Sequence, residues 1–241
     1  MPPDLLSWYD RLGLPILEGY GMTENCGVSH MTLPGIERPG TVGTPFDGVQ
    51  SRLDPDTGEV QMKSPGLMLG YYKQPELTQA AMTPDGWLRT GDKGALDAEG
   101  HLRITGRVKD LFKTSKGKYV SPAPIEDRLV MHPAIEACVV AGSDMAQPLG
   151  IVTLNEAAAA QAAEPAGRKA LEASLAEHLA IVNEALDPHE RLACLVVSPT
   201  AWTVDNDLIT PTMKVKRNRI EDTYARHYER WEASRQPVVW S

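Results

Sequence analysis

Apolar and polar positions alternate in short runs over the first hundred residues, and glycine or proline separates the runs. The runs 49–53 and 59–64 flank the turn sequence DPDTG, and the runs 94–97 and 101–106 flank AEG. Alternation on both sides of a turn predicts β-hairpins. The apolar run 14–21, which ends in glycines, predicts a buried strand. We therefore expect a small, strongly curved antiparallel β unit with few helices.

After about residue 106, the apolar positions recur at spacings of three and four, which is typical of amphipathic helices. Helices are predicted over 121–133, over 165–186, where Pro188 ends the pattern, and over about 217–234. Strands are predicted over 134–142 and 191–198. The alanine-rich stretch 155–167 is interpreted as a connection without function.

The last predicted helix carries large side chains along one stripe. Its members are Ile220, Tyr224, Tyr228 and Trp231. We interpret this stripe as core packing rather than as a ligand site. The change of pattern predicts an α+β fold in two parts, a β-rich part over 1–106 and a compact α+β part over 107–241.

Composition narrows the classes of protein that fit. The 241 residues are 42% hydrophobic and 23% charged, which is ordinary for a globular chain, and a net charge of −8 argues against a protein that coats nucleic acid. Three cysteines without a CxxC pair argue against a zinc site or disulfide framework, and Cys138 and Cys194 lie in apolar runs typical of buried thiols. The pattern indicates neither a signal peptide nor a transmembrane segment. We expect a cytoplasmic protein, and peripheral contact with the inner membrane stays open.

The first candidate motif is YGMTE, residues 20–24. Glycines on both sides of Tyr20 let the backbone pass close to a flat ring, Thr23 offers a hydroxyl to a phosphate, and Glu24 offers a carboxylate to a hard cation such as Mg²⁺. A glycine turn followed by a solvated Thr-Glu pair explains the pentapeptide equally well.

Three further stretches carry candidate chemistry. In RTGD, residues 89–92, an aspartate on a glycine turn can accept hydrogen bonds from ribose hydroxyls, although a structural turn is the simpler interpretation of this motif alone. Residues 106–126 combine Arg107, a lysine-rich loop with a glycine, and a helix that starts with prolines. The fourth stretch, ITPTMKVKR over 209–217, holds three cations. Its own pattern does not distinguish a basic patch for an anionic partner, an ordinary solvated strand end and a catalytic lysine, although the solvated strand end is the simplest interpretation of the stretch alone.

In this order and spacing, the four motifs together resemble the adenylate-forming superfamily, which includes acyl-CoA synthetases. The stretches FKTSKGKYVSPAPIE and ITPTMKVKR are most similar to long-chain fatty acyl-CoA synthetases. The resemblance runs over nearly the whole chain. It implies that 1–106 is the C-terminal part of a large AMP-binding domain and that 107–241 is the mobile C-terminal domain. It also implies a ligase that uses ATP, Mg²⁺ and coenzyme A to convert a fatty acid to acyl-AMP and then to acyl-CoA.

The resemblance implies roles for residues in the first part of the chain. Tyr20 would stack on adenine, with Gly21 beside it in the nucleotide site. Thr23 would contact the α-phosphate, and Glu24 would help to hold Mg²⁺. Asp92 would bind the ribose hydroxyls.

Further roles follow from the same resemblance. Arg107 would also reach the ribose, and Lys109 would be the hinge about which the C-terminal domain turns. Lys116 and Gly117 lie in the loop that would approach coenzyme A, although the segment is one residue longer than in many relatives, so which glycine lines the thiol path stays open. Lys214 would catalyse adenylation together with Thr23 and Glu24. Lys216 and Arg217 are expected to face solvent.

One part of the family pattern is missing from these 241 residues, namely the Ser/Thr/Gly-rich loop ending in Pro-Lys that cradles the β- and γ-phosphates. We therefore expect a C-terminal portion of a synthetase with an arbitrary start at MPPDLL, inactive without the N-terminal part. Half of a split ligase and a non-catalytic nucleotide-binding or regulatory module are the alternatives. An exposed β surface could also pair two copies as a homodimer.

Overall fold

The computed structural model describes residues 3–27, 29–35 and 38–241. The chain divides into two compact units between Lys109 and Asp110, and each unit is described by itself. Across the described parts of both units, no helix is long and apolar enough to cross a membrane.

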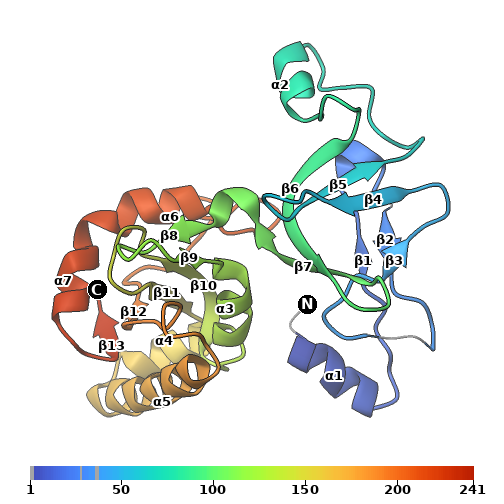
Figure 1. Ribbon diagram of the computed structural model, residues 1–241. Coiled ribbons are helices and arrows are strands. Elements are labelled where there is room, and N and C mark those ends of the chain that lie inside the picture. The colour runs from blue at the N-terminus through green and yellow to red at the C-terminus, as the bar shows by residue number, and fades with distance from the viewer. Residues whose placement is uncertain (1–2, 28, 36–37) are drawn as a thin grey trace. The chain divides into compact units, whose positions relative to one another are not determined.

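The N-terminal unit is built mainly from short antiparallel strands (Figure 1). One sheet has the order β4-β5-β6-β7, formed by Gln50–Leu53, Glu59–Lys63, Leu88–Leu96 and Leu102–Arg107. A smaller sheet contains β1 (Gly19–Tyr20), β2 (His30–Met31) and β3 (Thr44–Pro45), and the helices are α1 (Pro3–Arg11) and α2 (Pro75–Ala80). The core is small and centres on Val60, Met62 and Leu102.

Both predicted hairpins of this unit are confirmed, because β4 pairs with β5 and β6 pairs with β7, each in antiparallel register. The predicted buried strand over 14–21 is wrong. Only Gly19–Tyr20 of that run is a strand, and the side chains of Leu14 and Leu17 are exposed. Pro15 has no backbone N–H for a strand ladder, which gives the difference a physical reason.

The C-terminal unit contains a four-stranded sheet of order β10-β11-β12-β13. Its strands are Ile135–Ala141, Leu149–Leu154, Leu195–Val197 and Val238–Trp240. The first pair is antiparallel and the other two pairs are parallel. The helices are α3 (Pro122–Leu129), α4 (Glu156–Ala162), α5 (Pro165–Glu184), α6 (Arg217–Tyr224) and α7 (Tyr228–Ala233), and a separate hairpin joins β8 (Phe112–Lys113) to β9 (Tyr119–Val120).

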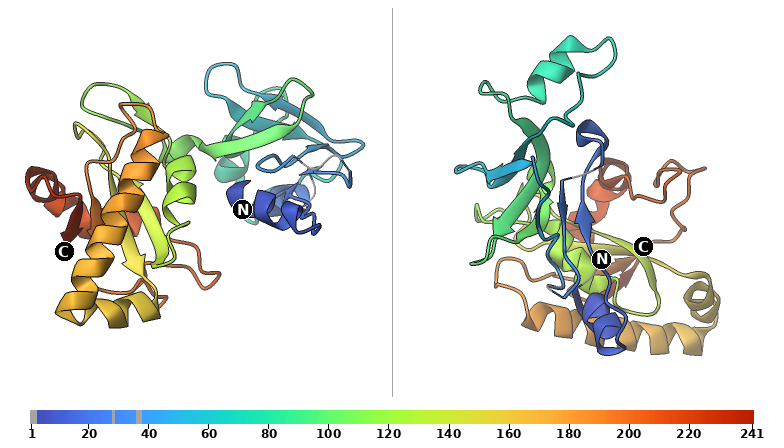
Figure 2. Two further views of the ribbon diagram at one scale, coloured as in Figure 1. Left: turned by 90° about the horizontal axis from the view of Figure 1, so that it is seen from below. Right: turned by 90° about the vertical axis from the view of Figure 1, so that its right-hand side faces the viewer.

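Both faces of this sheet are buried. Val152 packs in a cluster with Leu175 of α5, whereas its neighbour Ile151 packs in a second cluster with Trp231 of α7. Adjacent residues of a strand point to opposite faces, so one strand serves two cores. Figure 2 shows the long helix α5 lying along one face of the sheet. The aromatic stripe on the last helices lies in the second cluster, as predicted.

The predicted helices and strands of this unit are confirmed with shorter bounds, and the α+β class is confirmed. Two details differ. Residues 155–167 hold α4, because the side chain of Asn155 accepts a hydrogen bond from the Ala158 amide at 2.9 Å and starts a helix. The last predicted helix is two helices joined by a 3₁₀ turn. Cys138 and Cys194 are buried as predicted, and burial raises the pKa of both thiols.

Two positions on α5 test the importance of the first core cluster. Leu175 is fully buried, whereas Ile181 on the same helix is 59% exposed. We expect Leu175→Ala to lower the free energy of unfolding by about 2–5 kcal/mol, because it removes buried methyl groups and leaves a cavity. Ile181→Ala should change it by less than about 0.5 kcal/mol. Urea unfolding followed by circular dichroism measures both, and equal effects would contradict this packing.

A pH-dependent contribution to stability is expected from His30. The ring is buried and its Nδ1 lies 2.5 Å from the hydroxyl of Ser29, and burial lowers its pKa from 6.5 to about 4. Between these two values the unfolded chain binds a proton that the folded chain does not, so stability should fall as the pH drops from 6.5 towards 4. In an NMR titration, the histidine signal that is lost in His30→Gln should have a midpoint near pH 4. A midpoint near 6.5 would show that the ring is solvated.

Candidate functional site

Three of the predicted nucleotide-binding residues meet in the N-terminal unit. The Tyr20 hydroxyl donates a hydrogen bond to Asp92 Oδ2 at 2.6 Å, and Arg107 Nε donates to Asp92 Oδ1 at 2.9 Å. Asp92 on β6 and Arg107 on β7 are direct partners in the antiparallel ladder, so the hairpin itself brings them together. Tyr20 arrives from β1, in the other sheet of this unit. The Asp92 carboxylate is therefore the common partner of two side chains from two other strands.

The electrostatics of this group favour a neutral tyrosine and leave the carboxylate with spare acceptors. Burial, and then the hydrogen bond to Asp92, raise the pKa of Tyr20 well above its usual value, so its hydroxyl stays a donor. The Asp92 side chain is 13% exposed, whereas that of Arg107 is 60% exposed. A carboxylate offers about four acceptor positions, so the bonds to Tyr20 and Arg107 leave capacity for further donors such as ribose hydroxyls.

Thr23 and Glu24 lie in a 3₁₀ turn that follows Tyr20 and Gly21. The buried side chain of Asn25 fixes this turn, because its Oδ1 accepts a hydrogen bond from the backbone of Met22 at 2.9 Å. The hydroxyl of Thr23 is on an exposed residue, and Glu24 is half-buried.

Glu24 fits the donor chemistry that Mg²⁺ prefers. Its Oε1 accepts a hydrogen bond from the Tyr71 hydroxyl at 2.8 Å, and this bond raises the pKa of Tyr71. One such bond orients the carboxylate and leaves acceptor positions for a cation. Mg²⁺ commonly takes one or two carboxylates and completes its shell with water and substrate phosphates.

Lys214 lies on a tight turn of the C-terminal unit. The Thr210 amide donates to Lys214 O at 2.8 Å, and the Lys214 amide donates to Thr210 Oγ1 at 3.0 Å. Met213 takes a left-handed conformation with φ of 63° between them. Lys214 is exposed, and within the described residues its ammonium has no acidic partner. The turn therefore presents a cation on a short, hydrogen-bonded support.

The two neighbouring cations are bound within the protein, so the prediction that both face solvent is corrected. Lys216 forms an ion pair with Asp207. The Arg217 side chain is mostly buried, and it donates to Glu126 Oε1 at 2.5 Å and to the carbonyl of Val140 at 2.7 Å. Burying a guanidinium is costly unless it is paired and hydrogen-bonded, and Glu126 and Val140 supply these partners.

Lys116 and Gly117 lie in the turn of the β8–β9 hairpin. The Gly117 amide donates to Thr114 O at 2.8 Å, and its φ of +73° is in the left-handed region that favours glycine. Both residues are exposed. Lys109 is exposed in a 3₁₀ turn at the end of the N-terminal unit.

The structure thus groups Tyr20, Asp92 and Arg107 in one unit, and it has Lys214 and the Gly117 turn in the other. Sequence reasoning did not identify several supporting residues, namely Asn25, Tyr71, Glu126 and Glu59. Oε1 of Glu59 accepts a hydrogen bond from the Gly91 amide, next to Asp92, at 2.9 Å. Asn25 has a local signal, because an amide side chain three residues after Met22 can cap the turn. The partners of the other three are distant in sequence, so no local spacing points to them.

Comparison with protein families matches two parts of the chain. Residues 1–72 match the model of the AMP-binding enzymes, and residues 109–233 match the model of the AMP-binding enzyme C-terminal domain. The second match alone covers more than half of the chain, which confirms the resemblance to adenylate-forming enzymes.

Individual relatives agree with these family matches. The chain is 34% identical over 236 residues to the long-chain-fatty-acid–CoA ligase FadD15 of Mycobacterium bovis, which covers 92% of this chain and 39% of that protein. It is also 34% identical over 254 residues to the putative fatty-acid–CoA ligase fadD11 of Mycobacterium tuberculosis, covering 97% and 43%. The chain therefore spans about two-fifths of the length of these curated relatives.

A solved structure extends the likeness to three dimensions. The o-succinylbenzoate CoA synthetase of Bacillus subtilis, in complex with an acyl-adenylate intermediate, superposes with a TM-score of 0.72 at 26% identity, covering 92% of this chain and 44% of that one. The same synthetase has also been solved with ATP and a magnesium ion. On these matches, the chain belongs to the family of AMP-binding enzymes.

Proposed function

We propose that this chain is the C-terminal portion of a fatty acid–CoA ligase, which joins a fatty acid to coenzyme A at the expense of ATP. The observation that carries the proposal is that Tyr20 and Arg107 both bond the Asp92 carboxylate, in a chain whose relatives include fatty-acid–CoA ligases. On this proposal, the N-terminal unit is the end of the large domain and the C-terminal unit is the mobile domain.

The nucleotide would be held mainly by the N-terminal unit. The Asp92 carboxylate would accept hydrogen bonds from the ribose hydroxyls, and the Arg107 guanidinium would donate to a ribose oxygen. The Tyr20 ring would offer a flat surface to adenine beside Gly21. Thr23 offers its hydroxyl to the α-phosphate. Glu24 is the residue that would hold Mg²⁺, whose chemistry is to neutralise charge on the phosphates.

Lys214 would act in the first half-reaction. A carboxylate oxygen of the fatty acid attacks the α-phosphorus of ATP, the bond to the pyrophosphate oxygen breaks, and acyl-AMP forms. Two anions meet in this step and charge grows on the phosphoryl oxygens, so an ammonium held between them lowers the barrier. The exposed turn that carries Lys214 is suited to this, because the ammonium is not committed to an acidic partner in the described structure.

The second half-reaction would use the other turn of the same unit. The thiolate sulfur of coenzyme A, which has lost its proton, attacks the acyl carbonyl carbon, the bond to the phosphate oxygen breaks, and AMP leaves. Gly117 and Lys116 would border the path of the thiol, since the turn is exposed and glycine lets a chain pass close to the backbone. Lys109 would absorb the change of backbone dihedrals between the two half-reactions.

The same proposal includes a dependence on the remainder of the ligase. These 241 residues contain no Ser/Thr/Gly-rich loop ending in Pro-Lys, and backbone amides of such a loop are what neutralise the terminal phosphates of ATP. We expect no ATP–pyrophosphate exchange with a fatty acid from the chain alone. Addition of an N-terminal ligase half that carries the phosphate loop should restore exchange.

The exchange assay separates the competing interpretations of this chain. Exchange by the 241 residues alone would contradict their dependence on a second part. Failure of the added half to restore exchange, with both parts folded, would favour a non-catalytic nucleotide-binding module.

Within the paired system, Lys214→Ala should slow adenylation roughly 10²–10³-fold, by analogy with the loss of one preorganised charge donor. Thioester formation from preformed acyl-adenylate and coenzyme A should stay within about threefold, because Lys214 has no part in that step. Lys169→Ala, which removes an exposed lysine on α5, is the matched control. Stopped-flow measurement of each half-reaction tests this, and equal losses in both would refute the assignment.

A further inference from the structure

Strand β6 departs from a regular ladder at the point where it carries Asp92. Glu59 of β5 pairs with Lys93, and Gln61 pairs with Arg89, so the single residue Val60 lies opposite three residues of β6. The ladder then resumes, since the Gly94 amide donates to Gly58 O at 3.0 Å. A bulge of this kind leaves backbone groups without ladder partners, and in a part-buried place those groups need other partners.

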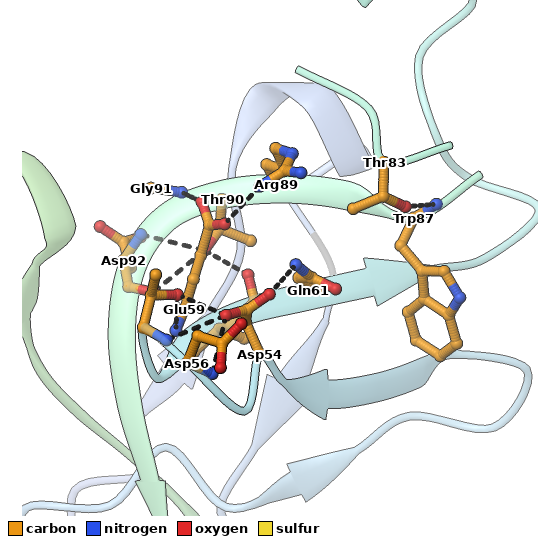
Figure 3. Close-up of polar contacts among 12 residues, drawn as sticks. Asp54, Asp56, Glu59, Gln61, Thr83, Trp87, Arg89, Thr90, Gly91 and Asp92 are labelled. Carbon is orange, nitrogen blue, oxygen red and sulfur yellow. Dashed lines mark hydrogen bonds and ion pairs between the residues drawn. The ribbon is translucent and has the colours of Figure 1, made fainter. Parts of the chain in front are cut away.

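Two side chains supply the missing partners. The Gly91 amide donates to Glu59 Oε1 at 2.9 Å, and the Asp92 amide donates to Thr90 Oγ1 at 3.1 Å. The Thr90 hydroxyl in turn donates to Val60 O at 2.7 Å. Figure 3 shows these side chains gathered between β5 and the curve of β6. The Glu59 carboxylate and the Thr90 hydroxyl therefore stabilise the bulge by accepting hydrogen bonds from its backbone amides.

Glu59 is itself well fixed. Its side chain is only 10% exposed, and Arg89 Nη1 lies 3.5 Å from its second carboxylate oxygen. Its amide donates to Thr57 Oγ1 at 3.2 Å, and the Thr57 amide and hydroxyl both donate to Asp54 Oδ1, each at 2.9 Å. These bonds from Thr57 lower the pKa of Asp54. The DPDTG turn thus anchors Glu59, which then holds the Gly91 amide.

We propose that Glu59 is a positioning residue for the nucleotide, which holds the Gly91 bend so that the Asp92 carboxylate can receive ribose hydroxyls. The inference rests on the proposed function, in which Asp92 binds the ribose. The hydrogen bond from the Gly91 amide to the Glu59 carboxylate is charge-assisted and is therefore stronger than a neutral one. It stabilises the sharp bend that the φ of +72° at Gly91 makes in the chain. Without it, Asp92 would lose its alignment with Tyr20 and Arg107.

The test compares AMP with 2′,3′-dideoxy-AMP, which lacks the ribose hydroxyls, by NMR titration of the 241-residue chain. Glu59→Ala should weaken AMP binding roughly tenfold, the scale of one lost hydrogen bond to a charged group. Binding of 2′,3′-dideoxy-AMP should change less than about twofold on the same reasoning. Glu59→Gln keeps an oxygen acceptor for Gly91 and should stay within about threefold of the wild type for AMP. Glu76→Ala, at an exposed position on α2, is the matched control.

Asp92→Ala separates failure of the inference from failure of the proposed ribose site. Selective loss of AMP binding in Asp92→Ala but not in Glu59→Ala would overturn the role of Glu59 alone. Equal weakening of both nucleotides in Glu59→Ala would make Glu59 a general structural residue and also overturn it. No AMP binding by the wild type, or no effect of Asp92→Ala, would refute the ribose site itself.

Amide hydrogen exchange checks the positioning step without any nucleotide. In Glu59→Ala, the Gly91 amide should exchange at least about tenfold faster, because its acceptor is lost. The Leu102 amide, which donates to Gly43 O at 2.8 Å, should keep its rate and so report an intact fold. An unchanged rate at Gly91 would contradict the proposal.

Discussion

The Asp92 carboxylate joins three strands of the N-terminal unit, because it accepts the Tyr20 hydroxyl of β1 and the Arg107 guanidinium of β7 while it is itself on β6. A part-buried carboxylate is stable only with such donors. The bulge at residues 90–92 brings the carboxylate to this place, and Glu59 and Thr90 satisfy the backbone that the bulge frees. The Asp92 carboxylate thus links the small sheet to the larger sheet at the candidate ribose site.

In the C-terminal unit, the cost of removing charged side chains from water limits where they can lie. Its sheet is covered on both faces, so charged side chains are confined to its edges unless they are paired. Arg217 enters this interior and is bound by Glu126 and Val140, whereas Lys214, three residues earlier, stays on the exposed turn. The same short stretch therefore contains one cation that is paired inside the unit and one that is exposed without an acidic partner among the described residues.

Local sequence patterns were sufficient to predict the hairpins around DPDTG and AEG and the helix α5. The apolar periods and turn residues of these elements lie within a few positions of one another. The prediction of a buried strand over 14–21 was wrong, because apolar composition alone does not show whether a segment has partner strands in a sheet. In the site, Asp92 and Arg107 are close because they are opposite in a hairpin, which sequence spacing can suggest. Arg217 meets Glu126 across 91 positions, and only the fold decides that contact.

The pair Arg217–Glu126 has a consequence for how such a chain can change over time. Glu126 is on α3, which follows the Gly117 turn, and Arg217 begins α6, which follows the Lys214 turn. One ion pair therefore joins helices α3 and α6, which follow the two turns. In the proposed reaction the two turns serve different half-reactions, so a substitution that breaks this ion pair is expected to disturb both steps.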